Sequence, residues 1–354
     1  MGHRGRHFYP VFTKRMMVQS SFTASLLRWF AQYGRELPWR GIGDPYGIWV
    51  SEVILQQTRI DQGTDYWHRF MKRFPTVEAL AAASEDEVLR LWQGLGYYSR
   101  ARNLHAAARQ IVEQGGFPST IEGLRALKGV GDYTAAAVSS MAFNLPAAAV
   151  DGNVYRVLAR HYGIDVPINT TRGKHTFEAL ARELLPVGEA GTFNQAMMDF
   201  GATWCTPRSP RCLDCPVAET CEALRTGRVD SLPVKEKKLK VRERRFSYIY
   251  IRHQGMMALR RRPEGDIWQG LWEPLFIEDA PLPDLGCPLT LLASGVKHVL
   301  THRVLLADFY LAEPDERPVL ADEYQWIDEH NLDDYALPRL VTRLLELLPA
   351  SSPD

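Results

Sequence analysis

Four of the five cysteines in this chain lie between residues 205 and 221, and this segment restricts the local fold more than any other. Cys205, Cys212, Cys215 and Cys221 follow the spacing Cys-x6-Cys-x2-Cys-x5-Cys, so their thiolates can surround one compact inorganic centre. Soft thiolates suit either a tetrahedral zinc ion or a 4Fe-4S cluster. Zinc sites more often combine two Cys-x2-Cys pairs, and this segment has one, so the spacing favours the cluster. Nothing nearby indicates a second cofactor, and we therefore expect the cluster to be structural.

The charge of the chain is balanced, with 42 Lys and Arg against 42 Asp and Glu. Binding to nucleic acid would therefore require the basic groups to be sorted onto one face. Residues 235–245 hold seven Lys or Arg and two Glu, and no acidic residue precedes Glu36. No apolar run is long enough to span a bilayer, and the N-terminus lacks the apolar segment of a signal peptide. We expect a cytoplasmic protein whose first residues, before Met16 and Met17, are a dispensable extension.

Hydrophobic periodicity divides the chain into a helical part and a mixed part. From Phe22 to about Gly201, apolar residues recur at spacings of three and four between short Gly or Pro breaks. This pattern predicts helices at residues 47–60, 62–74, 101–114, 133–143, 154–162, 173–185 and 193–203. Aromatic and β-branched runs then predict strands at residues 246–252, 256–260, 271–277, 304–311 and 324–327, before a helix at 339–348. The predicted division is an extension at 1–20, a mainly α domain at 21–230, a basic linker at 231–243 and an α+β domain at 244–350.

The stretch from Leu127 to Asp151 joins a glycine hairpin to a carboxylate. Gly129 and Gly131 allow a tight turn that places backbone N–H groups at the start of the next helix, and such an N-terminus attracts anions such as phosphate. Asp151 follows one helix later. Before Gly-Asn and a helical run, Asp151 is also a suitable N-cap. Capping and catalysis are compatible, and the residues alone leave both open.

Glu52 lies in a predicted helix that is apolar nearly all round. Burial would raise the pKa of this carboxyl and keep it protonated near neutral pH, as a general acid requires. A structural carboxyl that is hydrogen-bonded to a neighbouring helix is the commoner explanation for such a residue. The segment Gly94 to Arg100 places two tyrosines and a cation on a turn bounded by glycines, which can wedge into a base stack or pack in a core.

Together these features resemble the helix-hairpin-helix DNA glycosylase superfamily, whose members combine such a hairpin, an Asp shortly after it and this cysteine spacing. In the endonuclease III branch the second residue after Gly-Val-Gly is a lysine that attacks the sugar, whereas this chain has Tyr133. The chain is instead similar to the MutY-type adenine glycosylases, almost continuously from about residue 22 to residue 235. The stretches that carry the resemblance are Leu37-Pro38-Trp39-Arg40, Ser51 to Thr58, Gly94 to Arg100, Val150-Asp151-Gly152-Asn153 and Phe193-Asn194-Gln195.

The resemblance implies a monofunctional base excision repair enzyme that removes adenine paired with 8-oxoguanine or guanine in double-stranded DNA. Glu52 would protonate adenine N7 and help to activate water, and Asp151 would stabilise the oxocarbenium-like sugar. Tyr133 and Asn153 would support that centre. Six residues match positions that line the extruded-adenine pocket: Arg35, Trp39, Arg40, Leu55, Ile60 and Gln195. The predicted contacts with DNA and with the lesion are Gln57, Thr58, Tyr97, Gly129 and Gly131.

The C-terminal part resembles the Nudix-like domain of the same glycosylases, in which a Phe-Ser-His loop touches 8-oxoguanine. Here the loop reads Leu300-Thr301-His302, so Thr301 keeps the hydroxyl and His302 the ring while Leu300 replaces the aromatic residue. Trp268 to Glu273 resembles the Nudix strand, but no Glu-rich Nudix helix follows it, so pyrophosphohydrolase activity is not expected. We expect a monomer with no membrane partner. The alternatives are a bifunctional glycosylase/AP lyase and a cluster-bearing DNA-binding protein without catalysis.

Overall fold

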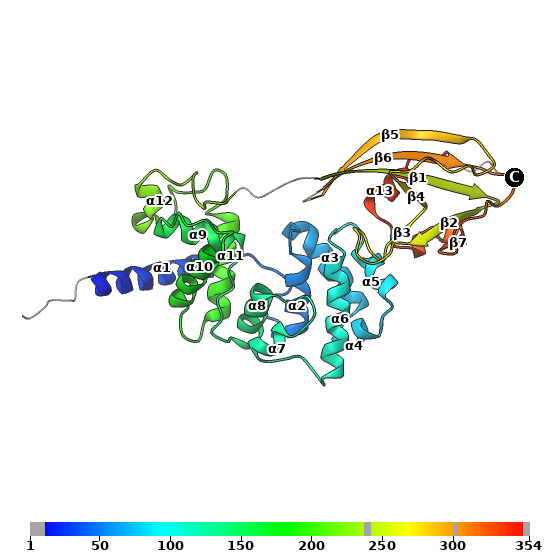
Figure 1. Ribbon diagram of the computed structural model, residues 1–354. Helices are drawn as coiled ribbons and strands as arrows, with labels where there is room; N and C mark the ends of the chain where they lie inside the picture. The colour runs from blue at the N-terminus through cyan, green and yellow to red at the C-terminus, as the bar shows by residue number, and fades with distance from the viewer. Residues whose placement is uncertain (1–10, 237–241, 301–302, 350–354) are drawn as a thin grey trace, which may run out of the picture. The chain divides into compact units, whose positions relative to one another are not determined.

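The structure is a computed structural model that describes residues 11–236, 242–300 and 303–349, with side chains from Ser21 onward. By their contacts the residues form two compact units, Met1–Met71 with Gln110–Lys237 and Lys72–Arg109 with Lys238–Asp354. The predicted fold class, mainly α and then α+β, is confirmed (Figure 1). The contact units assign residues 72–109 differently from the predicted domain boundaries. Those boundaries, as limits of independently folding domains, stay a prediction.

The first unit is helical. Its helices are α1 (Val11–Tyr33), α2 (Pro45–Ile54), α3 (Ile60–Arg73), α7 (Ile121–Arg125), α8 (Asp132–Phe143), α9 (Gly152–Tyr162), α10 (Thr171–Leu184), α11 (Ala190–Thr203) and α12 (Glu222–Arg225), with a 3-10 turn at Ala218–Thr220. Helix α8 packs against α2 and α11, and α11 also packs against α1 and α9. The alanine-rich sequence of α8 permits these close approaches. A core drawn from α1, α9, α10 and α11 contains Phe22, Leu158, Phe177 and Phe200, all buried.

Local signals in the sequence explain where the helices near the candidate site begin and end. Asp44 caps α2 by accepting hydrogen bonds from the N–H groups of Tyr46 and Gly47, and Pro45 occupies the first turn. The predicted helix at 47–60 is wrong at its C-terminal end, because the helix stops at Ile54. Gln57 adopts a φ of 59°, which breaks the helix without any Gly or Pro to announce the break.

The hairpin between α7 and α8 has the predicted helix-hairpin-helix form. Gly129 has a φ of 75°, the left-handed conformation that glycine adopts most readily. Gly131 stands at the N-cap of α8 and no side chain caps that helix, so its first N–H groups are not engaged by a capping side chain. A Cβ built on Gly131 would meet nothing within 4 Å, so the backbone here is open to an approaching ligand.

In the second unit, three helices precede a sheet and a fourth, α13, follows it. The first three helices are α4 (Val77–Ala82), α5 (Glu85–Trp92) and α6 (Ser99–Glu113). The strands are β1 (Arg242–His253), β2 (Met256–Arg261), β3 (Trp272–Glu273), β4 (Leu275–Glu278), β5 (Leu289–Val299), β6 (Arg303–Ala312) and β7 (Tyr324–Asp328). A 3-10 turn (Glu329–Asp334) and α13 (Arg339–Leu345) close the chain.

The strand order is β3-β2-β1-β6-β5, with β4 on β1 and β7 on β2. Strands β1 and β6 are parallel and the other pairs are antiparallel. Alternate residues of β1 enter two cores, Tyr248 and Tyr250 on the face with α13 and Ile249 and Ile251 on the other. The strand predicted at 271–277 is divided at Pro274 into β3 and β4. Strand β5 was not predicted.

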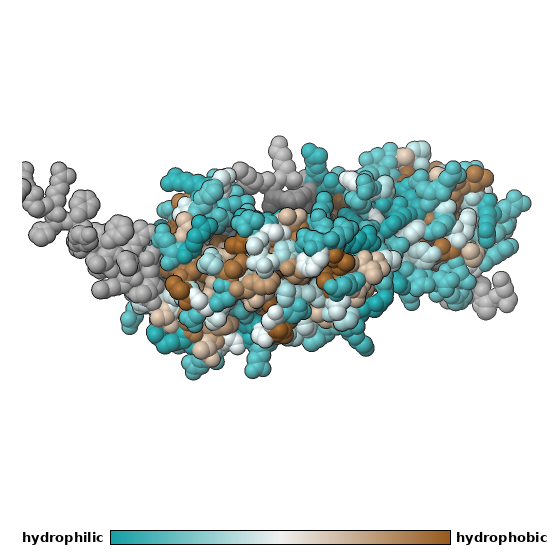
Figure 2. Space-filling view, turned by 90° about the horizontal axis from the view of Figure 1, so that it is seen from below, coloured by the Kyte–Doolittle hydropathy of each residue, from teal (hydrophilic) through white to brown (hydrophobic). Residues whose placement is uncertain are grey.

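The described surface mixes hydrophobic and hydrophilic side chains. On the face seen in Figure 2 the hydrophobic residues form separate patches among hydrophilic ones. No helix in the described ranges is both long enough and apolar enough to cross a membrane.

Candidate active site

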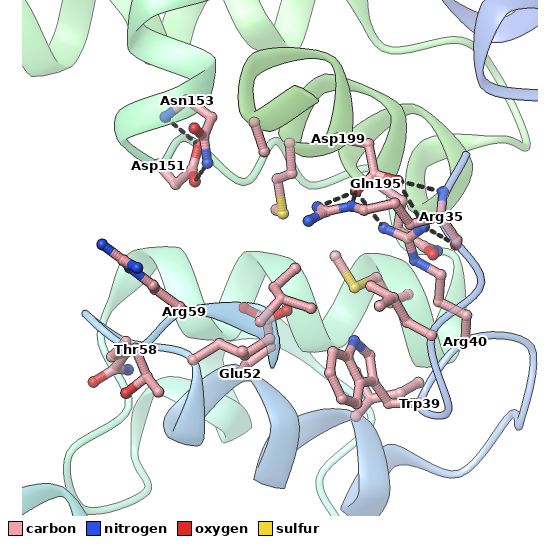
Figure 3. A pocket seen from close by; sticks show the side chains of 18 of the residues that line it. Arg35, Trp39, Arg40, Glu52, Thr58, Arg59, Asp151, Asn153, Gln195 and Asp199 are labelled. Carbon is pink, nitrogen blue, oxygen red and sulfur yellow. Dashed lines mark hydrogen bonds and ion pairs between the residues drawn. The ribbon is translucent and has the colours of Figure 1, made fainter. Parts of the chain in front are cut away.

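One cavity of about 870 Å³ in the first unit contains most of the predicted site. Its walls come from the segment before α2, from α2 and the loop that follows it, from the start of α3, and from α8, α9 and α11 (Figure 3). All four predicted catalytic residues and all six predicted adenine-pocket residues line it, as do Gln57 and Thr58: Arg35, Trp39, Arg40, Glu52, Leu55, Gln57, Thr58, Ile60, Tyr133, Asp151, Asn153 and Gln195. Residues up to 160 positions apart in the sequence therefore meet at one place.

Glu52 is a buried carboxyl with one close hydrogen-bond donor. Helix α2 is buried on nearly every side, and the Glu52 side chain faces the cavity. The Tyr133 hydroxyl donates to Oε2 of Glu52 at 2.8 Å and also lies 3.6 Å from the sulfur of Met198. Burial raises the pKa of Glu52 to about 7, with Asp151 adding to the shift while the Tyr133 hydrogen bond and Arg40 oppose it. Near neutral pH this carboxyl can therefore hold a proton and release it.

Asp151 caps α9 and faces the same cavity. Its Oδ1 accepts hydrogen bonds of 2.8 Å from the N–H groups of Asn153 and Val154, and its Oδ2 accepts one of 2.7 Å from the Asn153 amide. Burial raises the pKa of Asp151, although these hydrogen bonds and Arg156 oppose the shift. The capping interpretation is confirmed, and the cap fixes the carboxylate at the cavity wall. Figure 3 shows Glu52 and Asp151 on different sides of the cavity.

Arg156 connects the Asp151 region to the cysteine segment, which the sequence did not reveal. Its guanidinium donates to Oδ1 of Asn153 at 2.8 Å, to the Gly201 carbonyl at 2.6 Å and to the Cys205 carbonyl at 2.7 Å. Gly201 leaves no room between α11 and α9, because a Cβ there would lie 2.6 Å from that of Asn153. The position of Arg156 between the apolar Val154 and Val157 was the sequence signal that could have identified this link.

Asp199 is a second functional candidate that the sequence did not reveal. It is fully buried on α11 and lines the cavity. Its carboxylate accepts hydrogen bonds from the guanidinium groups of both Arg35 and Arg40, which thereby project into the cavity in fixed positions (Figure 3). Burial opposes ionisation, but the hydrogen bonds from Arg40 and Arg35 outweigh it and lower the pKa of Asp199. An Asp within an apolar helix carried the same signal as Glu52.

The remaining predicted contacts lie outside this cavity. Tyr97, in the second unit, is 47% exposed and has a φ of 47°, so its ring stands on a left-handed turn. Gly129 and Gly131 form the hairpin described above. Thr301 and His302 lie outside the described residues, so their roles stay predictions.

The four cysteines near α12 share another, smaller cavity. The Arg160 guanidinium donates to Sγ of Cys205 at 3.5 Å and to the Thr206 carbonyl at 2.7 Å. Burial, reinforced by the other three cysteines, raises the pKa of Cys215 to about 12. Among the described residues, no group of three or more His, Cys, Asp or Glu side chains surrounds a single metal-ion position. Four soft thiols around one cavity do fit an iron-sulfur cluster.

Family models match three segments of the chain. Residues 50–186 match the HhH-GPD superfamily of base excision DNA repair proteins, and residues 247–347 match the NUDIX domain. Residues 205–221 match the iron-sulfur binding domain of endonuclease III. These matches confirm the predicted helix-hairpin-helix fold, the Nudix-like domain and the 4Fe-4S cofactor.

Individual proteins show similarity over longer stretches. The adenine DNA glycosylase of Mus musculus is 43% identical over 60% of this chain and 44% of its own length, so the chain spans less than half of that relative. A solved structure of a thermostable thymine-DNA glycosylase matches with a TM-score of 0.56 and 30% identity, over 61% of this chain and all of that one. The adenine DNA glycosylase of Buchnera aphidicola subsp. Schizaphis graminum is 34% identical over 71% of this chain and 73% of its own length. On that extent of similarity, the chain belongs to the adenine DNA glycosylase family.

Proposed function

We propose that this protein is a monofunctional adenine DNA glycosylase of base excision repair, which acts as a monomer on double-stranded DNA. Its substrate is adenine paired with 8-oxoguanine or with guanine. The observation that carries the proposal is the cavity in which Tyr133 holds Glu52, with its pKa of about 7, while the capped Asp151 stands on another side. An enzyme that cleaves a glycosidic bond must first extrude the base, and this cavity supplies a pocket for it.

Glu52 supplies the proton in this mechanism. The protonated carboxyl donates to N7 of the extruded adenine, which makes the base a better leaving group, and the resulting carboxylate can then activate water. Tyr133 donates a hydrogen bond to the same carboxyl and so favours its ionised form once the proton has left. Burial raises the pKa of Tyr133 far above its usual range, so the phenol stays a donor throughout.

Asp151 stabilises the positive charge that develops on the sugar. Hydrogen bonds from the backbone and from Asn153 hold its carboxylate before the substrate arrives, so little reorganisation is needed during the reaction. Arg156 orients Asn153 and ties it to the cysteine segment. When bound to the four cysteines, the iron-sulfur cluster would hold that segment in place and take no part in bond cleavage.

The adenine is bound by the residues that line the deeper wall. Trp39 is buried and offers an indole face, and Leu55 and Ile60 add apolar surface against which a base can stack or pack. Arg35 and Arg40, fixed by Asp199, together with Gln195, present polar groups to the edge of the base. Gln57 and Thr58 would contact the DNA at the mouth of the cavity, with Tyr97 and the Gly129 and Gly131 hairpin binding elsewhere along the duplex.

Hydrolysis without a Schiff base is supported by the cavity composition. Tyr133 stands where the endonuclease III branch has its nucleophilic lysine, and among the described residues no lysine lines the cavity. In the C-terminal unit, Thr301 and His302 are proposed to contact the 8-oxoguanine opposite the adenine.

The direct test is single-turnover cleavage of duplexes that carry adenine opposite each of 8-oxoguanine, guanine, cytosine and thymine. Adenine release that is fastest opposite 8-oxoguanine, without strand cleavage by the enzyme itself, is expected. Efficient borohydride trapping on a pyrimidine lesion would instead favour a lyase. Binding to the mispair without an abasic product would favour a non-catalytic protein.

A further inference from the structure

Three arginines line the active-site cavity, and one of them differs from the others. Arg35 and Arg40 are both ion-paired with Asp199. The third, Arg59, makes no hydrogen bond, ion pair or ring contact through its guanidinium with any residue that the structure describes. Asp61 lines the same cavity, yet no ion pair joins it to Arg59 within the described ranges. Of the arginines in this lining, Arg59 is therefore the one without an ion-pair partner in the part of the chain that the structure describes.

The position of Arg59 is set by the backbone around it. It lies in the loop between α2 and α3, two residues after Gln57, whose backbone is left-handed. The Thr58 N–H donates to the Leu55 carbonyl at 3.2 Å, and the Gly63 N–H donates to the Arg59 carbonyl at 2.8 Å. The side chain is exposed, and in Figure 3 it extends from this loop toward the side of the cavity where Asp151 and Asn153 stand. The backbone is thus held while the guanidinium stays available at the rim.

The proposed reaction restricts what this guanidinium can bind. Positive charge develops on the sugar during cleavage. A guanidinium that pointed at the sugar would repel this charge and slow the reaction, so the sugar is not the partner of Arg59. An extruded nucleotide also carries a phosphodiester on each side, and a guanidinium binds phosphate oxygens through two parallel hydrogen bonds. We propose that Arg59 binds a phosphate flanking the extruded adenosine and so holds the nucleotide at the mouth of the cavity. This inference rests on the proposed function and adds a positioning residue to it.

The first test compares Arg59→Gln with Arg59→Lys and a matched control, Arg172→Gln. Arg172 is an exposed arginine on α10 that does not line the cavity. Binding is measured to a duplex that holds 2′-fluoro-2′-deoxyadenosine opposite 8-oxoguanine, because the fluorine prevents cleavage. Loss of one phosphate contact should make the slope of log affinity against log salt about 0.9 shallower for Arg59→Gln. Arg59→Lys should keep the slope, and Arg172→Gln should match the wild type.

The second test identifies the phosphate. A neutral methylphosphonate replaces the phosphate on the 5′ side or on the 3′ side of the target adenosine, in separate duplexes. At the contacted position the wild type should lose affinity by about tenfold, and Arg59→Gln should lose nothing further, since the partner is already absent. The proposal would be overturned if, at both phosphate positions, the methylphosphonate lowered the affinity of Arg59→Gln as much as that of the wild type. It would also be overturned if the slope of log affinity against log salt were the same for Arg59→Gln and Arg172→Gln. Neither measurement needs cleavage, so failure of the wild type to release adenine would count against the proposed function alone.

Discussion

The Tyr133 hydroxyl lies 2.8 Å from Oε2 of Glu52, so the buried acid of this site has a neutral donor as its closest partner. A neutral donor stabilises the ionised form of a carboxyl much less than a cation would. Burial therefore remains the dominant influence on Glu52, and its pKa lies near 7. A lysine or arginine in place of Tyr133 would have kept the carboxyl ionised and unable to donate a proton.

Replacing Glu52 with Gln should abolish adenine release while leaving binding to the mispair largely intact. The amide keeps the shape of the side chain but has no acidic proton to give, and loss of general acid catalysis costs about 10²- to 10⁴-fold in rate. Single-turnover cleavage and a binding titration on the same duplex measure the two effects. The exposed Glu113→Gln on α6 is the control. A cleavage rate for Glu52→Gln equal to that of Glu113→Gln would refute the assignment.

The cleavage rate should fall as pH rises through about 7, because only protonated Glu52 can donate to adenine. Tyr133→Phe removes a hydrogen bond that lowers the pKa of Glu52, so this variant should shift the falling limb to higher pH. Single-turnover rates measured across the pH range for both proteins test this. An unmoved limb in Tyr133→Phe would show that the phenol does not influence the acid.

The free energy of unfolding should also depend on the titration of Glu52. Folding raises the pKa of Glu52 from 4.5 to about 7, so its contribution to stability is fully present below pH 4.5 and is lost as pH rises through about 7. Gln cannot ionise and escapes that loss. Glu52→Gln should therefore gain free energy of unfolding relative to the wild type between about pH 5 and about pH 8, by up to about 3 kcal/mol. Denaturant titrations at about pH 5 and about pH 8 measure the free energy of unfolding of both proteins. If the difference between the two proteins did not change with pH, the raised pKa of the buried Glu52 would be contradicted.

Replacing Asp199 with Asn should destabilise the first unit and loosen the adenine pocket. Arg35 and Arg40 would lose their shared counter-charge, and removing one partner of a buried ion pair costs about 3 kcal/mol or more. The exposed Asp65→Asn on α3 is the matched control. Denaturant unfolding measures the stability, and the dissociation constant for the uncleavable duplex measures the pocket. Equal stability of the two variants would show that the pair contributes little.

Replacing Arg156 with Gln should slow cleavage by about tenfold or more without loss of the cluster, because Asn153 would lose the donor that orients it. Visible absorbance monitors the cluster, and single-turnover kinetics monitor the rate. Arg156→Lys retains the charge but not the three-way hydrogen bonding, so it should recover little activity. If the rate of Arg156→Gln fell only in proportion to a loss of absorbance, the effect would be on cluster retention and not on Asn153.

The sequence predicted the site residues that carry local signals. Asp151 was recognisable as an N-cap and Gly129 as a turn, because both depend on neighbours within a few positions. Glu52 was conspicuous in an apolar helix. Asp199 carried the same signal on α11, but its meaning depends on Arg35 and Arg40, about 160 residues away in the chain, and no local pattern pairs them. The lack of an ion-pair partner for Arg59 among the described residues was hidden for the same reason, since it depends on which arginines Asp199 pairs with.

Errors in the predicted elements have similar causes. The helix expected at 47–60 ends early, at Ile54, and the backbone turns left-handed at Gln57, a residue type that does not indicate such a turn from the sequence. Strand β5 was missed because its burial does not alternate, and register shifts interrupt its pairing between Leu291 and Val296. Helix α5 belongs to the same contact unit as the C-terminal sheet, and Arg261 forms ion pairs with Glu85 and Asp86 of this helix. Sequence periodicity cannot reveal ion pairs between residues so far apart in the chain.

Asp151 has two functions, as the N-cap of α9 and as the proposed catalytic carboxylate, and protonation would remove both. The carboxylate that would face the developing sugar cation is also the acceptor that secures the first turn of the helix. Acid strong enough to protonate it would remove the catalytic charge and release the N–H groups of Asn153 and Val154 in the same step. Loss of cleavage activity at low pH and fraying of this helix should therefore show the same pH dependence. The rate of amide hydrogen exchange at Asn153 and Val154 should then report whether Asp151 carries its catalytic charge.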